Sequence, residues 1–487
     1  MSKQLPTELW YRVIQSLSPR DQKTCLSVCK MHHDITIKYV FSHLIITLGL
    51  WRMDDDMESM WDINLARTAV QVIESKRVAR VNYALLRHIG MRNPDFARNV
   101  KKLTVRAYSL FEETPMEYEI GTLVDAIEAL QNLTAFAWYG PLPITPSEVM
   151  DALRRTSGQK VVDILLHPEI PENMCLPSFT QLESLVFTHR FVDLWPAMHA
   201  DEIPYHKTVQ ETIAANAATL RRLDVFGDVL WECPSPSFAN LHELTIVFPN
   251  TFDGLEVVKT HPDAFPNLTS FKLLSVFDLP DEAVEEVAKF LKKKKLLRRV
   301  DVITRTEAQA REALVNVSLL KILPELPRLE VLGLDIRPAK LTAAHVKLLH
   351  QYVPRQVTAL FILFQFGSSD AKVADWRNFF SKHDALRYLH IATLTPPTRS
   401  LGNAIFKRPP PALELLGYNN GMRWVTHNPT TYSGFWPHAK MYFRTVEDYD
   451  GCEDWEWLLR HHGQGDDCDI WSMSPPDTWK RMDAEAV

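Results

Sequence analysis

Cysteine is scarce in this chain and forms no recognisable pattern. The 487 residues contain six cysteines, Cys25, Cys29, Cys175, Cys233, Cys452 and Cys468. They are too few and too scattered for a disulfide framework, which favours a reducing compartment. Cys25 and Cys29 lie four residues apart, but no nearby histidine completes a zinc site at the usual spacing. Both are therefore predicted to be small core residues, and no metal site is expected.

Long apolar runs and a strong excess of one charge are also missing. No stretch of about 18 apolar residues occurs, so no membrane-spanning helix is expected. The N-terminus lacks the basic region and apolar run that are typical of a signal peptide. The formal net charge of −6 excludes a strong global field toward nucleic acid or an acidic membrane. We therefore expect a cytoplasmic and/or nuclear protein that binds neither.

Catalytic signatures are absent as well. The sequence has no GxSxG, no GxxxxGK[ST] and no GxGxxG that follows a strand. The adjacent pairs His32-His33 and His461-His462 would not face one another on a helix, so they are not expected to bind metal. The prediction is a protein without catalysis or cofactors, and an enzyme with an unrecognised site is the alternative.

The strongest basic run comprises Lys292 to Lys295 with Arg298 and Arg299. Such a run can be a nuclear localisation signal or a nucleic-acid contact. More often it is the solvated end of a helix, where cations suit the carbonyl pole. We favour the second interpretation.

The first forty residues have the spacing of three short helices. Leu9, Trp10, Val13, Ile14 and Leu17 fall on one helical face. A second helix is predicted to begin at Pro19, and a third lies within HHDITIKYVF from His32. Such a piece rarely stabilises itself, and its apolar residues exceed what three small helices can bury. An excess of this kind usually marks an interaction surface.

These residues resemble the F-box motif. Leu5-Pro6-x-Glu8-Leu9, Val13-Ile14-x-x-Leu17 and Leu26-x-Val28-Cys29-Lys30 carry the resemblance over roughly residues 4 to 45. It departs from the family at Met31-His32-His33, where many F-boxes have an aromatic residue. F-box proteins bind the adaptor subunit of SCF ubiquitin ligases, and through it a cullin. The adaptor-binding residues implied by the resemblance are Leu5, Pro6, Leu9, Val13, Ile14, Leu17, Leu26 and Val28. A helical cap over the first repeat is the alternative.

A six-residue pattern, apolar-x-x-apolar-x-apolar, recurs through the rest of the chain. It occurs as VKKLTV from Val100, LTAFAW from Leu133, VVDILL from Val161, LESLVF from Leu182, LRRLDV from Leu220, LHELTI from Leu241, LTSFKL from Leu268, LRRVDV from Leu297, LEVLGL from Leu329, VTALFI from Val357, LRYLHI from Leu386 and LELLGY from Leu413, with FSHLII from Phe41 as a possible earlier member. The mean period is about 28 residues, within the leucine-rich-repeat range. A generic α/β protein with coincidental apolar runs is the alternative.

The spacing predicts how each unit folds. Alternate strand residues point to opposite faces, so the fourth and sixth positions point inward. Helical stretches such as those from Asp281 and Thr342 can return the chain to a parallel strand. The pattern resembles leucine-rich repeats, although the consensus asparagine is absent from every unit. Because that asparagine normally pairs turn backbone groups, we expect an irregular solenoid in which those groups find other partners.

The predicted fold is therefore α/β: an F-box at residues 1–45, an irregular repeat solenoid with parallel strands and outer helices at 46–440, and a C-terminal cap and tail at 441–487. Trp455, Trp457 and Leu458 are candidates to cover the last core edge. A binding tail is the alternative for this segment. The outward strand positions predicted to bind a target are Phe226, Val247, Lys272, Leu274, Asp301, Asp335, Phe361 and His390.

The resemblance implies a substrate-recognition subunit of an SCF-type ligase that joins the adaptor subunit to an unknown protein substrate. The mixed charges and apolar side chains at the outward positions favour a protein or peptide ligand over a phosphate group alone. A scaffold that uses the F-box without ubiquitin transfer is the second hypothesis.

Overall fold

The computed structural model describes two compact units of the chain. Unit 1 comprises Met1–Thr188, Lys207–Thr219 and Ser474–Val487, and unit 2 comprises His189–His206 and Leu220–Met473. The residues described are 5–17, 19–49, 77, 80–89, 94–108, 117–142, 145–166, 170, 174–187, 206–231, 233, 238–248, 258–259, 261–275, 279–304, 317–336, 340–364, 368–369, 373–393, 409–418, 421–427, 430–431 and 452–459. The predicted division at residues 45 and 440 stays a prediction.

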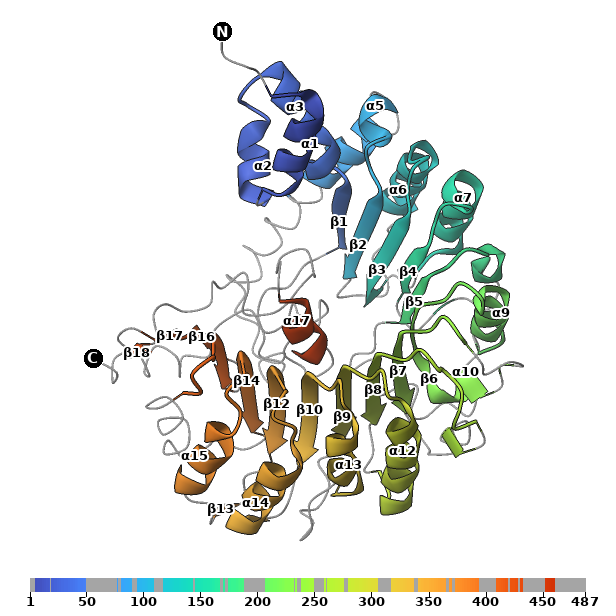
Figure 1. Ribbon diagram of the computed structural model, residues 1–487. Coiled ribbons are helices and arrows are strands. Elements are labelled where there is room, and N and C mark those ends of the chain that lie inside the picture. The colour runs from blue at the N-terminus through green and yellow to red at the C-terminus, as the bar shows by residue number, and fades with distance from the viewer. Residues whose placement is uncertain are drawn as a thin grey trace, which may run out of the picture. The chain divides into compact units, whose positions relative to one another are not determined.

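Unit 1 begins with three short helices that lead directly into a strand (Figure 1). They are α1 (Thr7–Gln15), α2 (Pro19–Cys25) and α3 (Lys30–Val40), and the strand β1 (His43–Gly49) comes next. The helices fall where the apolar spacing predicts them. Only Phe41 and Ser42 separate α3 from β1, so the helical segment and the sheet of this unit have no linker between them.

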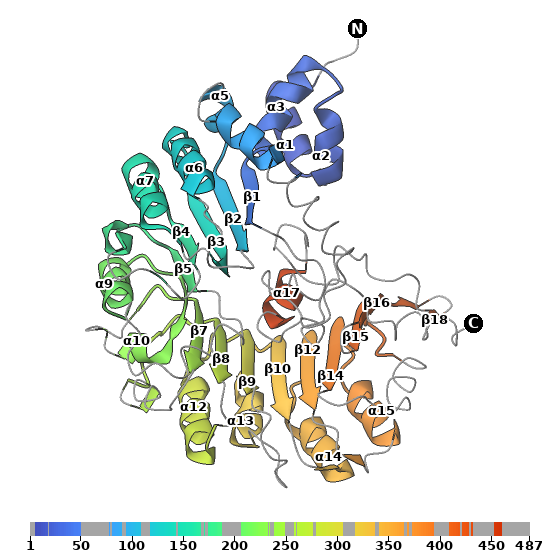
Figure 2. The same cartoon turned by 180° about the vertical axis from the view of Figure 1, so that it is seen from behind.

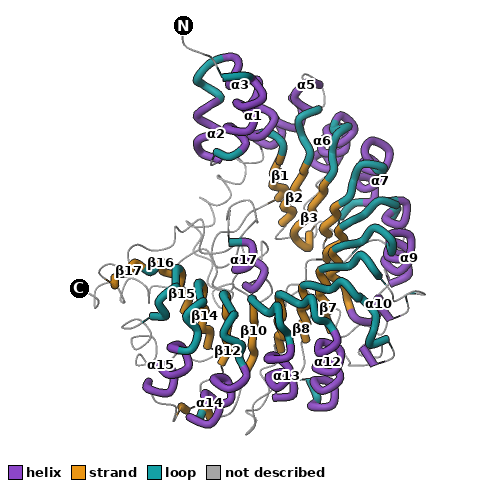
Figure 3. Tube along the Cα trace, viewed as in Figure 1, coloured by secondary structure: helices purple, strands orange, loops and turns teal. Residues whose placement is uncertain are grey.

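The sheet of unit 1 is parallel, with its strands in chain order (Figure 3). After β1 come β2 (Lys102–Tyr108), β3 (Ala135–Leu142), β4 (Asp163–Leu166) and β5 (Ser184–Phe187). The helices of this unit include α5 (Pro94–Ala97), α6 (Glu117–Ala129), α7 (Ser147–Ser157) and α9 (His206–Asn216).

Unit 2 repeats the arrangement with a larger number of described strands. Its strands pair in the order β6 (Arg222–Phe226), β7 (Glu243–Phe248), β8 (Ser270–Ser275), β9 (Arg299–Thr304), β10 (Val331–Ile336), β12 (Ala359–Phe364), β14 (Tyr388–Thr393), β15 (Leu415–Tyr418) and β16 (Gly421–Trp424). All neighbours are parallel except β15 and β16, which are antiparallel.

Helices of unit 2 cover one face of this sheet, and one further helix lies on the other face. Figures 1 and 2 show the first group of helices on one face of the sheet, and we call the opposite face the strand face. These helices are α12 (Asp281–Lys293), α13 (Val317–Ile322), α14 (Ala343–Tyr352) and α15 (Val373–Ser381). The helix on the strand face is α17 (Glu453–Leu459). The shorter elements of the unit are α10 (Gly227–Trp231), β11 (Lys340–Leu341) paired with β13 (Ser368–Ser369), and β17 (Thr426–His427) paired with β18 (Thr430–Thr431).

Every predicted copy of the six-residue pattern is a strand, the copy from Phe41 included. The strands pair position for position: Leu103 faces Phe136 at the fourth position, and Val105 faces Trp138 at the sixth. All four side chains are buried, as the predicted inward positions require. The parallel strands with returning helices confirm an α/β repeat fold.

The connections between strands are irregular, as expected without the consensus asparagine. Between β8 and β9 lies the 13-residue α12, whereas the 3₁₀ helix Leu176–Ser178 with only three residues lies between β4 and β5. In α14, Thr342 caps the first turn, since its hydroxyl accepts from the backbone N–H of His345.

Other side chains bind the turn backbone in place of that asparagine. The Asn132 side chain donates to the Arg98 carbonyl at 2.9 Å, and Thr134 donates to the Lys101 carbonyl at 3.2 Å. The second Asn-Leu-Thr triplet repeats the arrangement: Asn267 donates to Ala239 at 2.6 Å and Thr269 to His242 at 2.9 Å. Each triplet ties one repeat to the previous one. Its threonine hydroxyl adds a third hydrogen bond to a carbonyl that already accepts from two backbone N–H groups of the next repeat.

A row of fifth-position side chains crosses the strand face of unit 2. We call it the central row: Asp224, Thr245, Lys272, Asp301, Gly333, Phe361, His390 and Gly417, each paired with the next. Its two glycines have a steric purpose. A Cβ at Gly333 would overlap the Asp301 carboxylate, and one at Gly417 would overlap the His390 ring. Each glycine therefore leaves room for a polar side chain on the preceding strand.

This geometry predicts that Gly333→Ala destabilises unit 2 by about 1–3 kcal/mol, because the new methyl group must displace a packed carboxylate. Hydrogen exchange of the amides in β9 and β10 measures the effect. Gly121→Ala is the control: it lies in α6 with open space around the new Cβ, so it should not weaken the protein. Unchanged protection in β9 and β10 of Gly333→Ala would show that the carboxylate has room to move.

Candidate interaction surfaces

Five exposed apolar side chains lie in the N-terminal helical segment, on its helices and on the residues beside them. The N-terminal patch comprises Leu5, Leu9, Val13, Val28 and Met31, whose exposed fractions run from 38% to 61%. Leu9 and Val13 lie one turn apart on α1. Several large apolar side chains exposed to this degree within one short helical segment are typical of a protein-binding surface rather than of a self-contained domain.

The opposite side of α1 packs inside the helical segment. Ile14 is fully buried, and its carbonyl accepts from the Gln22 side chain at 3.0 Å. The ring of Trp10 meets His32 edge-on with 4.6 Å between centroids. Lys38 donates to the Tyr11 hydroxyl at 3.0 Å, which raises the Lys38 pKa, chiefly through that hydrogen bond. α1 is thus anchored to α2 and α3 through one side while its other side stays exposed.

The structure therefore separates the predicted adaptor-binding residues into two groups. Leu5, Pro6, Leu9, Val13 and Val28 are exposed. Leu17 and Leu26 are half-buried, and Ile14 is buried, so the prediction that Ile14 is a contact residue needs correction. The apolar spacing predicts a stripe on the helix that is wide enough for core contacts and for partner contacts. The spacing does not show which residues of the stripe are buried and which are exposed.

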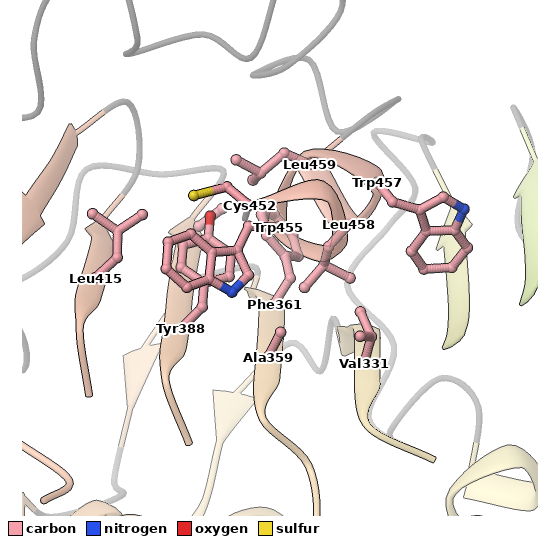
Figure 4. Close-up of a cluster of buried hydrophobic side chains, with 11 residues drawn as sticks. Val331, Ala359, Phe361, Tyr388, Leu415, Cys452, Trp455, Trp457, Leu458 and Leu459 are labelled. Atoms are coloured by element: carbon pink, nitrogen blue, oxygen red, sulfur yellow. The ribbon is translucent and has the colours of Figure 1, made fainter. Parts of the chain in front are cut away.

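The second candidate surface is the strand face of unit 2, which α17 covers in part. The apolar contacts form one cluster (Figure 4). It consists of Val331, Ala359, Phe361, Tyr388, Ala392, Leu415, Cys452, Trp455, Trp457, Leu458 and Leu459. In Figure 4 the two tryptophan side chains point to opposite sides of the helix. The Trp455 ring lies over Tyr388, and the Trp457 ring points away from it. The stacked rings of Trp455 and Tyr388 have centroids 5.3 Å apart.

An acidic side chain of α17 binds two arginines of β9 and its approach. Asp454 accepts two hydrogen bonds from the Arg298 guanidinium, both at 2.6 Å, and it lies 2.9 Å from the Arg299 Nε. Burial alone would raise the Asp454 pKa, but the hydrogen bonds and charges of the two arginines outweigh it and hold the pKa below the usual value of an aspartate. The carboxylate is thus ionised at neutral pH and makes a charge-assisted fork with Arg298.

A buried lysine binds the other end of the same helix. Lys272 is 1% exposed and pairs with Asp301 at 2.9 Å. Its ammonium also donates to the Trp457 carbonyl at 2.7 Å and to the Leu458 carbonyl at 3.4 Å, and it lies 4.6 Å from the centroid of a Trp457 ring. The cation therefore satisfies carbonyls at the C-terminal turn of α17, where a positive charge is favoured.

Burial extends to a polar pair beside this helix. The Tyr388 hydroxyl and His390 Nδ1 share a hydrogen bond at 2.9 Å, and neither side chain is exposed. Burial raises the pKa of Tyr388, which keeps the phenol neutral. Tyr388 therefore presents a ring to Trp455 while its polar end is satisfied within the sheet.

The predicted target-binding positions lie on the strand face, but none is open surface. Phe226, Val247, Lys272, Leu274, Asp301, Asp335, Phe361 and His390 are all at most 2% exposed. The expectation of an accessible face is therefore wrong for these residues. For Lys272 and Phe361 the burial has a visible cause, because α17, which is distant in sequence, contacts both residues.

The same contacts correct the predicted place of the C-terminal tryptophans. Trp455, Trp457 and Leu458 pack on the strand face and not on the end of the repeats. β16, antiparallel to β15, lies at that end of the sheet instead. The acidic and aromatic composition of this segment was visible in the sequence. Its partners, Arg298, Arg299 and Tyr388, were not, because they sit in other repeats.

The basic run is engaged in intramolecular contacts, which supports its interpretation as a structural helix end. Lys292 lies 3.0 Å from Glu325, and Lys293 lies 3.2 Å from Asp263. Lys294 donates to the carbonyls of Pro262 and Ala264, and burial lowers its pKa to about 8. Arg298 and Arg299 bind Asp454. Nucleic acid could therefore contact this basic run in the folded protein only if these ion pairs were broken.

The described ranges contain neither a metal cluster nor a membrane span. Within them, no group of three or more His, Cys, Asp or Glu side chains is arranged to hold a metal ion. No helix among the described residues combines the length and the apolar composition needed to cross a bilayer. Cys468 and the pair His461-His462 lie outside the described residues.

Comparisons with known proteins give distant structural matches only, and one of them is described here. No protein-family model matches the sequence, and no curated protein matches it. A chain of the crystal structure of the Rad7 and Elc1 complex in yeast matches with a TM-score of 0.43 and 13% identity, over 76% of this chain and 90% of that chain. A similarity this low carries neither function nor partners to this chain.

Removing the charge of Lys272 should lower the free energy of unfolding. Lys272→Met leaves Asp301 buried without its ion-pair partner, and the loss of one member of such a pair costs about 3–5 kcal/mol. Urea denaturation followed by tryptophan fluorescence measures it. The exposed pair of Lys289 and Glu286 supplies the control, since Lys289→Met should leave the unfolding free energy unchanged. Equal effects of the two substitutions would contradict a buried ionic anchor.

The Asp454 interaction should also be visible in the pH dependence of stability. Because the folded-state pKa is lowered, the stabilisation is present above about pH 4 and is lost as the pH falls through the folded-state value. The difference in unfolding free energy between the wild type and Asp454→Asn should therefore be largest near neutral pH and shrink as the pH falls below the usual pKa of an aspartate. A difference that is independent of pH would mean that the carboxylate charge is not what the arginines bind.

Proposed function

We propose that this chain is the substrate-recognition subunit of an SCF-type ubiquitin ligase. The N-terminal helices would dock on the adaptor subunit, and through it on a cullin, while the repeats hold a target protein. In this proposal the chain acts in the cytoplasm and/or the nucleus and performs no chemistry itself. It supplies proximity, because a tethered target is presented to the ubiquitin-loaded enzyme at high effective concentration.

The N-terminal patch is the observation that carries this proposal. Five large apolar side chains stay exposed although Ile14 and Ile35 give the helices a small core of their own. The patch includes Leu5, Leu9, Val13 and Val28, which occupy motif positions of the F-box resemblance. A cap that merely shields the first repeat would turn these side chains toward β1 and not toward solvent. The exposed patch thus favours a partner over an internal cap.

The scaffold alternative shares the adaptor contact and differs only in the steps after adaptor binding. Purification of the chain with its adaptor separates the two: a cullin that co-purifies and ubiquitin transfer to a bound protein support the ligase. An adaptor complex that excludes the cullin supports the scaffold.

The adaptor contact can be tested with a matched pair of exposed valines. Val13→Asp should reduce adaptor binding at least tenfold, because it places an unpaired charge in an apolar contact. Val81→Asp is the control: Val81 is 58% exposed on a helix of the same unit but lies outside the N-terminal patch. Pull-down and calorimetry with the purified adaptor subunit measure both variants.

The outcome is informative only if Val13→Asp stays folded, which circular dichroism and thermal melting establish. Ile14→Asp is expected to fail this check, since Ile14 is buried, and so it is unsuitable as an interface variant. Adaptor binding of folded Val13→Asp that equals the wild type, or no binding by the wild-type chain, would remove the proposal.

A further inference from the structure

The contacts of α17 are those of a short peptide bound to a protein surface. The helix has seven residues, and its side of the contact includes the Asp454 carboxylate, two indoles, a leucine pair and two backbone carbonyls, with Glu456 buried as well. The opposite side lies far away in sequence: Lys272 is 185 residues from Trp457, and Arg298 is 156 residues from Asp454. Few residues of α17 thus account for many specific contacts.

The residue types are those that dominate protein interfaces. Tryptophan, tyrosine and arginine are enriched at binding hot spots, and Trp455, Trp457, Tyr388, Arg298 and Arg299 meet here. If the helix served stability alone, apolar side chains would hold it equally well, because a buried ion pair seldom adds net stability. The strand face instead keeps Lys272 and Asp301 buried and directs the lysine at backbone carbonyls of the helix. This favours recognition over simple core filling.

The recognition elements have a clear order along the helix. Arg298 and Arg299 require a carboxylate in its first turn, Tyr388 receives the next residue as a flat ring, and Trp457 lies between Lys272 and Arg299. Lys272 then binds the carbonyls of the final turn, which any helix presents. The complementary ligand is therefore a short helix with an Asp-Trp-Glu-Trp-Leu pattern, since Glu456 is buried as well.

We propose that the strand face of unit 2 is a receptor for a short acidic, tryptophan-bearing helix, and that α17 is its resident ligand. A helix of the same chemistry in a target protein displaces α17 and takes its place. The identity of this partner as a ligase target rests on the proposed function, whereas the receptor site itself does not.

Displacement has a quantitative consequence for target binding. A ligand tethered in the same chain competes at an effective concentration on the order of millimolar. The apparent dissociation constant of a target rises by the inverse of the fraction of molecules whose site is open. α17 therefore excludes weak ligands and admits only a segment that matches its own contacts or is present in a high local amount.

The experiment uses the full chain and a labelled synthetic peptide of its residues 450–460. Asp454→Lys in the full chain places a cation against Arg298 and Arg299 and should release α17, so that the peptide binds at least tenfold more tightly than to the wild type. Glu453→Lys is the matched control, since this exposed acid lies on the same helix beside Asp454 and should leave the site closed. Fluorescence anisotropy measures binding, and a peptide with Asp454→Lys should not bind to any of the three chains.

A second arrangement covers the case in which Asp454→Lys fails to fold. A protease site placed between Thr431 and Cys452 of the full chain is cut after folding, and excess peptide is added. Loss of the C-terminal fragment on gel filtration, with the peptide bound in its place, supports the proposal. A fragment that does not exchange, unfolding on cleavage, or a folded Asp454→Lys chain that ignores the peptide overturns it and makes α17 a fixed part of unit 2.

These outcomes are independent of the adaptor test. Val13→Asp should exchange the peptide as the wild type does, and Asp454→Lys should bind the adaptor as the wild type does. Failure of the ligase proposal would remove only the identification of the partner as a ligase target, while failure of peptide exchange would leave adaptor binding untouched.

Discussion

The buried pair of Lys272 and Asp301 is the interaction on which the rest of unit 2 depends. Two opposite charges that are at most 1% exposed are tolerated only if every remaining polar site is satisfied. The ammonium meets this requirement by donating to the carbonyls of Trp457 and Leu458, and the Asp301 carboxylate, which binds Lys272, fits in the space that Gly333 leaves. The pair thus links the choice of glycine on β10 to the position of α17, which is distant in the sequence.

The repeat pattern explains how such a coupling arises. In a parallel solenoid, equivalent positions of successive strands lie side by side, so the central row brings together residues about one repeat apart. A charged residue at the fifth position of one unit must be matched by its neighbours at the same position. The lysine of β8 requires the aspartate of β9 as its ion-pair partner, and that aspartate requires the glycine of β10 for space.

The sequence predicted local features well because their causes are local. Apolar spacing identified every strand copy, and the motif positions of Leu103 and Val105 gave the buried face directly. α12 began at the predicted Asp281. What failed were the statements that depend on distant partners. Ile14 and Val13 have the same character in the sequence, and only the tertiary packing that buries Ile14 distinguishes them. Likewise, nothing near residue 455 indicates Tyr388 as its partner.

The link between α3 and β1 bears on how an adaptor bound to the helices would be oriented. The Ser42 carbonyl accepts from the backbone N–H groups of Lys101 and Lys102 at 2.8 and 2.9 Å, so the last turn before β1 already belongs to the ladder of unit 1. Phe41 packs against Phe96 with 4.9 Å between ring centroids. A subunit whose task is to hold two partners near each other benefits from such rigidity, because each freely rotating joint lowers the effective concentration of one partner at the other. Since no flexible linker separates the N-terminal patch from the first repeats, a partner bound there would keep a fixed orientation relative to the sheet of unit 1.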